Sequence, residues 1–249
     1  PILDHPYFNE RYFFPREAEV PEPFWVESGD VRLSCYYHKR NAHPEAKTVI
    51  YFHGNGEVVS DYVELFVPLF EQMGYNLLLA EYRGYSMSTG TPALVTMMQD
   101  VDKIIEAVQL PPERIVLYGR SIGSLFVTQG VWKYPNIAGL IIESGIALLL
   151  ERVLMRLHPD DIGATMEQLE EEIAVHFNHE EKLKNFKGKT LVLHARHDSL
   201  VHHAHGLKLH EWAPEPKYLK VFEQGDHNDI FYVNAEEYFK MVFQFLGTL

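Results

Sequence analysis

The chain has 249 residues, of which 46% are apolar and 23% are charged, a composition typical of a globular protein with a sizeable core. Its net charge of -13 argues against nucleic acid and anionic membrane surfaces as partners, because both would repel the protein as a whole. The single cysteine, Cys35, excludes an internal disulfide framework and favours a reducing compartment. Because the sequence also shows neither a transmembrane segment nor a signal-peptide core, we expect a cytoplasmic protein.

The predicted elements begin with an arm. Residues 1–23 are rich in proline, aromatic and charged residues without a clear period, and they predict an extended segment that lies on the body. Alternating residues at 24–27 and 31–37, separated by Ser28-Gly29-Asp30, predict an antiparallel hairpin at a sheet edge. Continuous apolar runs then predict strands that are buried on both faces, at 48–52, 76–80, 115–118, 138–142 and 191–194.

Segments with helical spacing alternate with these strands. They lie at 58–73, 93–108 and 125–134, and the last part of the chain adds a helix at 202–212, a strand at 218–222 and a closing helix at 234–246. Because such crossovers place successive strands in parallel, we expect an α/β fold with a mainly parallel, eight-stranded twisted sheet and helices on both faces.

The alternation is interrupted at residues 145–189. Here residues 146–157 and 165–177 predict two or three amphipathic helices that follow each other without a strand between them. We expect a short helical cap over the carboxyl ends of the strands, inserted within a single domain that covers residues 1–249. The segment 146–157 is apolar over more than half of its circumference, which predicts packing onto the body; the alternative is that part of this face lines an acyl pocket.

The motif Gly119-Arg120-Ser121-Ile122-Gly123 joins a predicted buried strand to a predicted helix. So sharp a turn needs small residues at 119 and 123, because larger side chains would collide with the neighbouring strand and helix. Ser121 would then have a strained backbone and a hydroxyl that projects beyond the sheet edge, as a nucleophile requires. The alternative is a serine that only caps the helix.

A serine hydroxyl is a weak nucleophile at neutral pH, so Ser121 needs a base and a group that orients this base. His227 follows the last predicted strand, and Asp198 follows the strand at 191–194. Both are therefore expected at the same edge of the sheet as Ser121, which makes these three residues the predicted catalytic group.

Other residues compete for these roles. Glu143, at the end of a predicted strand, is the substitute acid if Asp198 is only a surface turn residue. Asp226 and Asp229 flank His227 but lie too close to it in the sequence to orient its ring. A solvated loop position is the alternative for His227 itself.

The transition state also needs donors for an oxyanion. Phe52-His53-Gly54-Asn55-Gly56 follows a predicted strand and can present the backbone N-H of Asn55, and the N-H of Ile122 is the second predicted donor. We expect His53 to brace this loop by hydrogen bonds. The segment lacks the further glycine and the lysine of a phosphate-binding loop, so no nucleotide cofactor is expected.

Two arginines and a group of histidines are expected to have structural roles. Arg83 and Arg120 are expected to bind carbonyls and carboxylates within the fold, with an anionic substrate group as the alternative. Six histidines are close in sequence, but their spacing matches no two-histidine zinc motif, so no metal is expected; they are His194, His197, His202, His203, His205 and His210.

With the serine, acid and histidine motifs in this order, the chain resembles the alpha/beta-hydrolase superfamily over residues 24–247. The segment 81–86 also resembles a loop of small serine hydrolases related to acyl-protein thioesterases. Two positions depart from these patterns: Ala195 replaces a glycine often found three residues before the acid, and Arg120 stands where such relatives often carry glutamine or histidine. The resemblance implies an alpha/beta-hydrolase fold without a cofactor.

We therefore expect a serine hydrolase that cleaves a carboxylic ester or thioester of a small-to-medium acyl group. Ser121 attacks the acyl carbon, His227 transfers the proton and Asp198 orients the imidazole. The alternatives are a peptidase with the same triad and a catalytically silent protein that binds a small molecule. The oligomeric state is left open.

Overall fold

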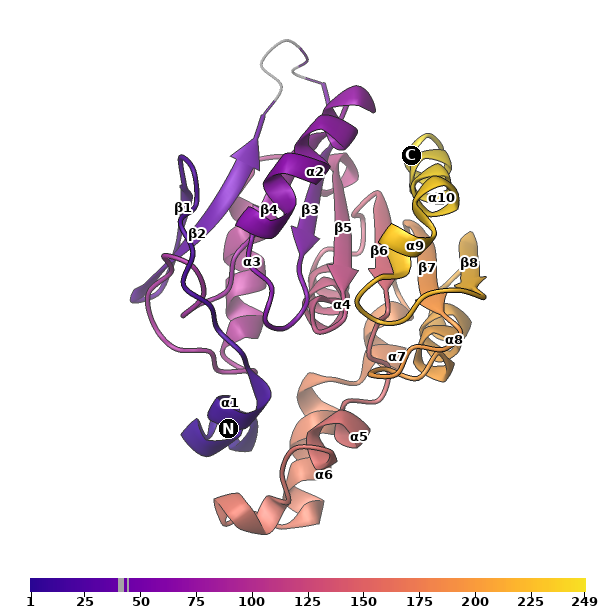
Figure 1. Cartoon of the computed structure of the whole chain (residues 1–249). Helices are drawn as coiled ribbons and strands as arrows, with labels where there is room; N and C mark the ends of the chain where they lie inside the picture. Colours follow the sequence, from indigo (N-terminus) through magenta and orange to yellow (C-terminus); the bar gives the residue numbers. More distant parts are fainter. Residues whose placement is uncertain (40–42, 44) are drawn as a thin grey trace.

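The computed structural model describes residues 1–39, 43 and 45–249. Its strands form one sheet with the order β1-β2-β4-β3-β5-β6-β7-β8 (Figure 1). The strands are β1 (Phe24–Ser28), β2 (Val31–His38), β3 (Thr48–Phe52), β4 (Asn76–Ala80), β5 (Ile115–Arg120), β6 (Gly139–Glu143), β7 (Lys189–Ala195) and β8 (Lys217–Phe222).

The pairing confirms the predicted sheet. Strand β2 pairs antiparallel with β1 and β4, and all the other neighbours are parallel. Every residue of β3, β4, β5 and β6 is buried, as expected for strands covered on both faces. The hairpin between β1 and β2 turns at Gly29, whose positive φ of 63° suits glycine.

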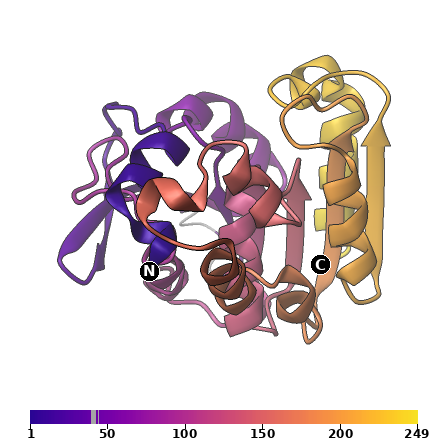
Figure 2. The same ribbon diagram turned by 90° about the horizontal axis from the view of Figure 1, so that it is seen from below.

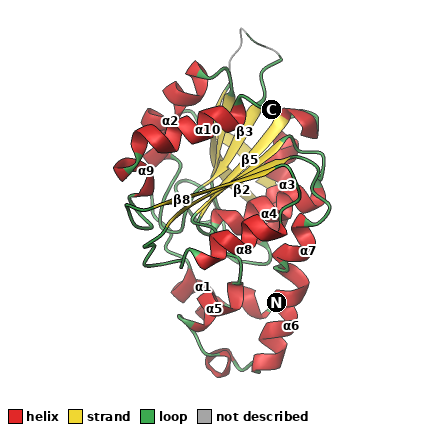
Figure 3. Ribbon diagram, turned by 90° about the vertical axis from the view of Figure 1, so that its right-hand side faces the viewer, coloured by secondary structure: helices red, strands yellow, loops and turns green. Residues whose placement is uncertain are grey.

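Helices cover both faces of the sheet (Figure 3). On one face lie α2 (Ser60–Gln72), α9 (Ile230–Val233) and α10 (Ala235–Leu246), and on the other lie α3 (Met97–Ala107), α4 (Gly123–Lys133), α7 (His179–Leu183) and α8 (Ala204–Trp212). A 3-10 turn, η2 (Pro112–Arg114), precedes β5. Among the helices of the described residues, none combines the length and the apolar character needed to span a bilayer.

Each face of the sheet has its own hydrophobic core. Phe66 and Phe70 of α2 pack with Val242 and Phe245 of α10 in one core. The other core contains Val101 and Ile104 of α3 together with apolar residues of α4. Burial of these side chains fixes the strands and therefore the loops at their carboxyl ends.

The N-terminal segment differs from the extended arm predicted for residues 1–23. It begins with a 3-10 turn, η1 (Ile2–Asp4), and a helix, α1 (Pro6–Tyr12). His5 caps this helix by accepting a hydrogen bond from the backbone of Tyr7, and Pro6 occupies the first turn, where its missing N-H costs nothing. Phe8 and Tyr12, four residues apart, stack on the buried side of α1.

The segment between β6 and β7 also corrects a prediction. Instead of a helix over 146–157, it forms the shorter α5 (Leu149–Leu154), followed by η3 (Pro159–Ile162) and α6 (Met166–His176). Before α5 the backbone N-H groups bond to side chains of other helices: Ser124 accepts from Ile146, and His205 Nδ1 accepts from Ala147 and Leu148. Helix α6 has the expected position and starts at a capping box between Thr165 and Gln168.

Helices α1, α5 and α6 lie beyond the carboxyl ends of β3, β5 and β6 (Figure 1). Seen from that end, the N-terminal segment and the segment between β6 and β7 lie side by side (Figure 2). The carboxylate of Glu172 in α6 joins them, because it accepts hydrogen bonds from the backbone N-H groups of Ile2 and Leu3 at 2.7 and 2.8 Å. The leading and the central parts of the chain thus meet over one edge of the sheet.

Candidate active site

Ser121 stands at the sharp turn between β5 and α4. Its φ is 54°, so the strained backbone that the sequence predicts is present. A Cβ atom at position 123 would lie 2.1 Å from the carbonyl oxygen of Phe52, and one at position 119 would lie 2.6 Å from the carbonyl oxygen of Gly123. Only glycine fits at either position, and the Ser121 backbone is held further by its N-H, which donates to the Glu143 carbonyl.

The structure brings the three predicted catalytic residues together. His227 Nε2 lies 2.9 Å from Ser121 Oγ, and His227 Nδ1 lies 2.8 Å from Asp198 Oδ2. All three side chains are buried, although they come from three separate loops at the carboxyl ends of β5, β7 and β8. A base within hydrogen-bond reach of a hydroxyl and a carboxylate on its other nitrogen form the arrangement that activates a serine.

Asp198 is held by donors on both oxygens. Its Oδ1 accepts from the backbone N-H groups of Leu200 and Val201, and its Oδ2 faces both His227 and His194. Burial acts to raise the pKa of Asp198, but the hydrogen bonds from His194 and His227 outweigh it and hold this pKa well below its usual value. The carboxylate therefore stays ionised beside the imidazole.

The competing acids have other partners. Glu143 contacts Tyr118, Tyr238 and Arg120, and no hydrogen bond joins it to the His227 ring among the described residues. Asp226 accepts from the backbone and hydroxyl of Ser199, whereas Asp229 accepts from the backbone of Asp226, so both organise the loop.

The buried side chain of Arg120 contacts three segments around this site. Its guanidinium group donates to the carbonyl oxygen of His227 at 3.0 Å and pairs with Glu57 at 3.1 Å and Glu143 at 3.4 Å. Burial alone would lower the pKa of Arg120, but the two carboxylates raise it above its usual value. The interpretation of Arg120 as a residue that binds groups within the fold is confirmed, and Arg83 likewise makes a bidentate pair with Asp100.

The loop after β3 is braced from several sides. His53 Nε2 lies 2.7 Å from Glu81 Oε1, and the hydroxyl of Tyr82 donates to the His53 carbonyl. Glu57 accepts from the backbone N-H of Gly54 at 2.6 Å. Burial opposes the charged form of His53, but Glu81 prevails and raises its pKa. The segment 81–86 thus supports this loop through Glu81 and Tyr82.

The two residues predicted to supply the oxyanion donors line the same pocket. Asn55 and Ile122 both line the pocket that contains Ser121. Among the described residues, neither the backbone N-H of Asn55 nor that of Ile122 donates a hydrogen bond. Their role as oxyanion donors stays a prediction.

The Asn55 side chain has a role that the sequence does not reveal. Its amide oxygen accepts from the Phe14 backbone N-H at 3.0 Å and from the Tyr85 hydroxyl at 2.9 Å, and its amide nitrogen donates to the Tyr12 carbonyl. These bonds hold the N-terminal segment over the candidate site.

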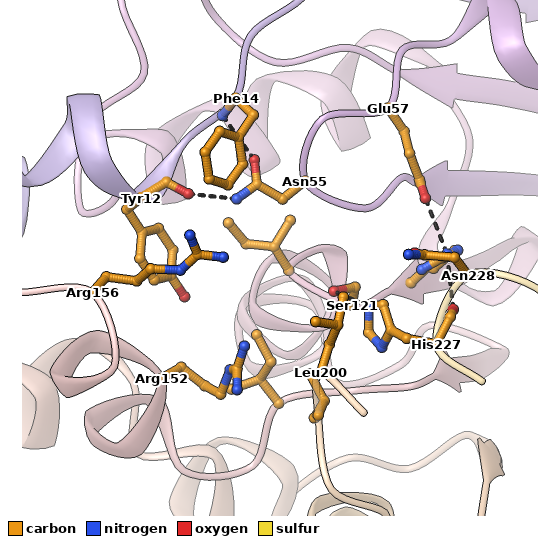
Figure 4. Close-up of a pocket in the computed structure, with 14 residues that line it drawn as sticks. Tyr12, Phe14, Asn55, Glu57, Ser121, Arg152, Arg156, Leu200, His227 and Asn228 are labelled. Carbon is orange, nitrogen blue, oxygen red and sulfur yellow. Dashed lines mark hydrogen bonds and ion pairs between the residues drawn. The ribbon is translucent and has the colours of Figure 1, made fainter. Parts of the chain in front are cut away.

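The pocket around Ser121 has a volume of about 240 Å³ (Figure 4). Several residues that line the pocket were not expected from the sequence. Tyr12 and Phe14 come from the N-terminal segment, and Arg152 and Arg156 come from α5 and the turn after it. The spacing of Arg152 and Arg156 is a signal, since residues four apart on a helix share a face. Leu149 and Val153 of α5 pack into the core, which agrees with the predicted packing of this segment, whereas Leu154 is exposed and Ile146 lines the pocket.

The remaining candidates do not converge on a ligand. His194 faces Asp198, and His205 accepts from the backbone and pairs with Glu151. Within residues 1–39, 43 and 45–249, no three His, Cys, Asp or Glu side chains are placed to hold a metal ion. At Ala195 the chain is an ordinary end of β7, so the absent glycine does not disturb the turn to Asp198.

Comparisons with known proteins agree with this architecture. The family model described as serine aminopeptidase, S33, matches residues 43–160. Alpha/beta hydrolase domain-containing protein 17C of Mus musculus is 27% identical over 220 residues, covering 86% of this chain and 65% of that protein, so the match spans less than two thirds of the relative's own length.

Two solved structures share the fold. The esterase Pf2001 of Pyrococcus furiosus has a TM-score of 0.73 at 19% identity and covers 94% of this chain and 98% of its own. Est1E of Butyrivibrio proteoclasticus, solved with ferulic acid bound, has a TM-score of 0.73 at 15% identity and covers 90% and 99%. Together with the eight-stranded sheet, these findings show the alpha/beta-hydrolase fold, and the sequence is similar to alpha/beta hydrolase domain proteins.

Proposed function

We propose that the protein is a serine hydrolase that cleaves carboxylic esters or thioesters of small-to-medium acyl groups. The fold and the family model support a hydrolase. The observation that carries the finer proposal is the continuous contact from Ser121 Oγ through the His227 ring to Asp198, at 2.9 and 2.8 Å.

In the proposed first step, Ser121 Oγ attacks the acyl carbon while His227 Nε2 takes the hydroxyl proton. The bond to the leaving oxygen or sulfur then breaks, and His227 returns that proton to the leaving group, which departs as an alcohol or thiol. Asp198 stays ionised and stabilises the imidazolium. The N-H groups of Asn55 and Ile122 bind the developing oxyanion.

In the second step, water attacks the acyl-enzyme. His227 takes one proton from the water, the hydroxyl group joins the acyl carbon, and the proton returns to Ser121 Oγ as the carboxylic acid leaves. No step requires a cofactor. The whole chain, 1–249, would act as one catalytic domain with residues 145–189 as its cap.

The size of the pocket supports the proposed acyl class. Its volume of about 240 Å³ is below the ~300–1,000 Å³ of typical drug-sized ligand sites. Apolar walls from Ile122, Ile146 and Leu200 suit a short hydrocarbon segment. The free, buried thiol of Cys35 fits a reducing compartment, so a cytoplasmic location is part of the proposal.

The test is a panel of p-nitrophenyl esters of increasing chain length, with a matched thioester and an aminoacyl p-nitroanilide. We expect ester and thioester turnover that is highest for short and medium chains and that falls at least about 10³-fold in Ser121→Ala. Turnover of only the anilide, or of only very long chains, would overturn the proposal.

A peptidase is the second candidate, because the matching family model is described as a serine aminopeptidase. The same panel decides between the two: a peptidase would prefer the aminoacyl anilide to the simple esters. A catalytically silent binding protein would cleave none of the probes.

A further inference from the structure

Two arginines of the pocket wall have no carboxylate partner within the part of the chain that the structure describes. Arg152 is half-buried and Arg156 is exposed, and both contribute to the pocket wall that faces Ser121 (Figure 4). The contacts of these side chains within the described residues are weak: Arg152 reaches the sulfur of Met155, and Arg156 lies over the ring of Phe14 at 5.2 Å. No carboxylate of that part of the chain lies within ion-pair distance of either guanidinium group.

This lack of partners is unusual for the protein. The chain carries a net charge of -13, and most of its other described arginines pair with a carboxylate. These are Arg16, Arg32, Arg83, Arg114, Arg120 and Arg196. In so acidic a protein, two unpaired arginines four residues apart on the wall of one pocket form a site for an anion from outside.

The position of the pair defines which part of a substrate it would meet. Figure 4 shows the two guanidinium groups on the side of Ser121 away from His227, with the hydroxyl of Tyr12 pointing toward them. Because His227 must return a proton to the leaving group, the leaving group lies on the His227 side and the acyl chain extends toward Arg152 and Arg156.

The opposite end of the pocket holds charges that are already paired with each other. The carboxylate of Glu57 lines that end near Asn228 and His227 (Figure 4). Because Glu57 pairs with Arg120 at 3.1 Å, its charge is offset there, whereas the arginine pair would attract a negatively charged acyl end. The attraction for an anion is therefore greater at the acyl end of the pocket than at the leaving-group end.

We propose that the preferred substrate carries a carboxylate at the far end of its acyl group, as in a half-ester of a dicarboxylic acid, and that Arg152 and Arg156 bind this carboxylate. The inference rests on the proposed ester or thioester hydrolysis. The anion-binding role, which the sequence offered as an alternative for Arg83 and Arg120, would thus belong to Arg152 and Arg156.

The test compares two probes that differ in one charge, mono-p-nitrophenyl adipate and its neutral methyl ester. We expect kcat/KM for the charged probe to exceed that for the neutral one, and the ratio to fall about 10-fold or more in Arg152→Gln/Arg156→Gln, since hydrogen bonds to charged groups are the strong ones. The ratio should also fall as the ionic strength rises. Arg32→Gln, a matched change on β2 outside the pocket, should keep the wild-type ratio.

A second pair of probes separates the two ends of the pocket. Phenyl acetate and 4-carboxyphenyl acetate place the charge on the leaving group, and we expect no preference for the charged one. A preference there, or a wild-type adipate ratio that the double variant leaves unchanged, would overturn the inference while hydrolysis of the neutral esters still supports the proposed function.

The inference has a readout that does not need turnover. In Ser121→Ala, adipate should raise the thermal unfolding temperature, and the arginine double variant in the same background should lose this shift. If no probe is hydrolysed but the shift is present, the proposed function fails and the anion site stands. An absent shift contradicts the anion site.

Discussion

His194 Nε2 lies 3.3 Å from Asp198 Oδ2, the same oxygen that His227 contacts at 2.8 Å. Two buried imidazoles therefore share one carboxylate. His194 also lies 2.8 Å from the carbonyl oxygen of Val201, which fixes its ring. A side chain outside the predicted triad thus helps to hold Asp198 ionised and in place.

Replacing His194 tests this positioning role. In His194→Phe the carboxylate loses a donor, and we expect kcat to fall about 10-fold with little change in KM, because one hydrogen bond to a charged group is lost. His194→Gln keeps a donor near the same point and should recover most of the rate. Steady-state kinetics with a short p-nitrophenyl ester measure kcat and KM of both variants. An unchanged kcat in His194→Phe would contradict the positioning role of His194.

The assignment of the acid can be tested by comparing two neutralising substitutions. Asp198→Asn should lower kcat about 10³- to 10⁴-fold, because the imidazole loses the group that orients it and stabilises its charged form. Glu143→Gln removes the other candidate carboxylate and should have a much smaller effect. The reverse order of the two effects would make Glu143 the acid.

Arg120 is expected to be essential for stability. Arg120→Met leaves Glu57 and Glu143 without their counter-charge and the His227 carbonyl without its donor, so we expect a loss of about 3–5 kcal/mol in the free energy of unfolding. The matched control, Arg32→Gln, breaks an exposed pair and should cost under about 1 kcal/mol. Urea unfolding compares the two, and equal costs would contradict this account of Arg120.

Stability should fall at mildly acidic pH through His179. Burial, and secondly the charge of Lys182, lowers the pKa of His179 from 6.5 to about 3. The neutral ring is favoured in the folded state, so this stability is fully present above pH 6.5 and is lost as the pH falls toward 3, where the unfolded chain binds the proton first.

The measurement is the free energy of unfolding at pH 7 and pH 5. His179 should account for about 2 kcal/mol of the difference. His179→Asn removes the titrating ring and should flatten the pH dependence by this amount. An equally steep dependence in the variant would assign the acid sensitivity to other groups.

The strands and the nucleophile turn are predictable because their causes are local. Continuous apolar runs give buried strands, and Gly119 and Gly123 flank Ser121 where a Cβ would collide with backbone atoms. The edge hairpin around Gly29 follows from the same kind of signal. Register and strand order then bring Ser121, Asp198 and His227 to one edge of the sheet.

What the sequence did not predict depends on contacts between distant segments. Helix α1 has a His5 cap and buries Phe8, and the segment before α5 is held by His205, more than 50 residues away, which accepts the N-H groups of Ala147 and Leu148. The pocket wall has the same origin: Asn55 holds Tyr12, 43 positions earlier in the chain, over the site. No local pattern encodes such pairings, although the four-residue spacing of Arg152 and Arg156 would place them on one face of the helix predicted at 146–157.

The most direct test of the central claim is the reaction of the folded protein with a fluorophosphonate, followed by intact mass and peptide mapping. The account predicts one adduct, on the peptide that contains Ser121, which is absent in Ser121→Ala and formed more slowly in His227→Ala. A folded protein that forms no adduct, or one that forms the same adduct without the Ser121 hydroxyl, would contradict it.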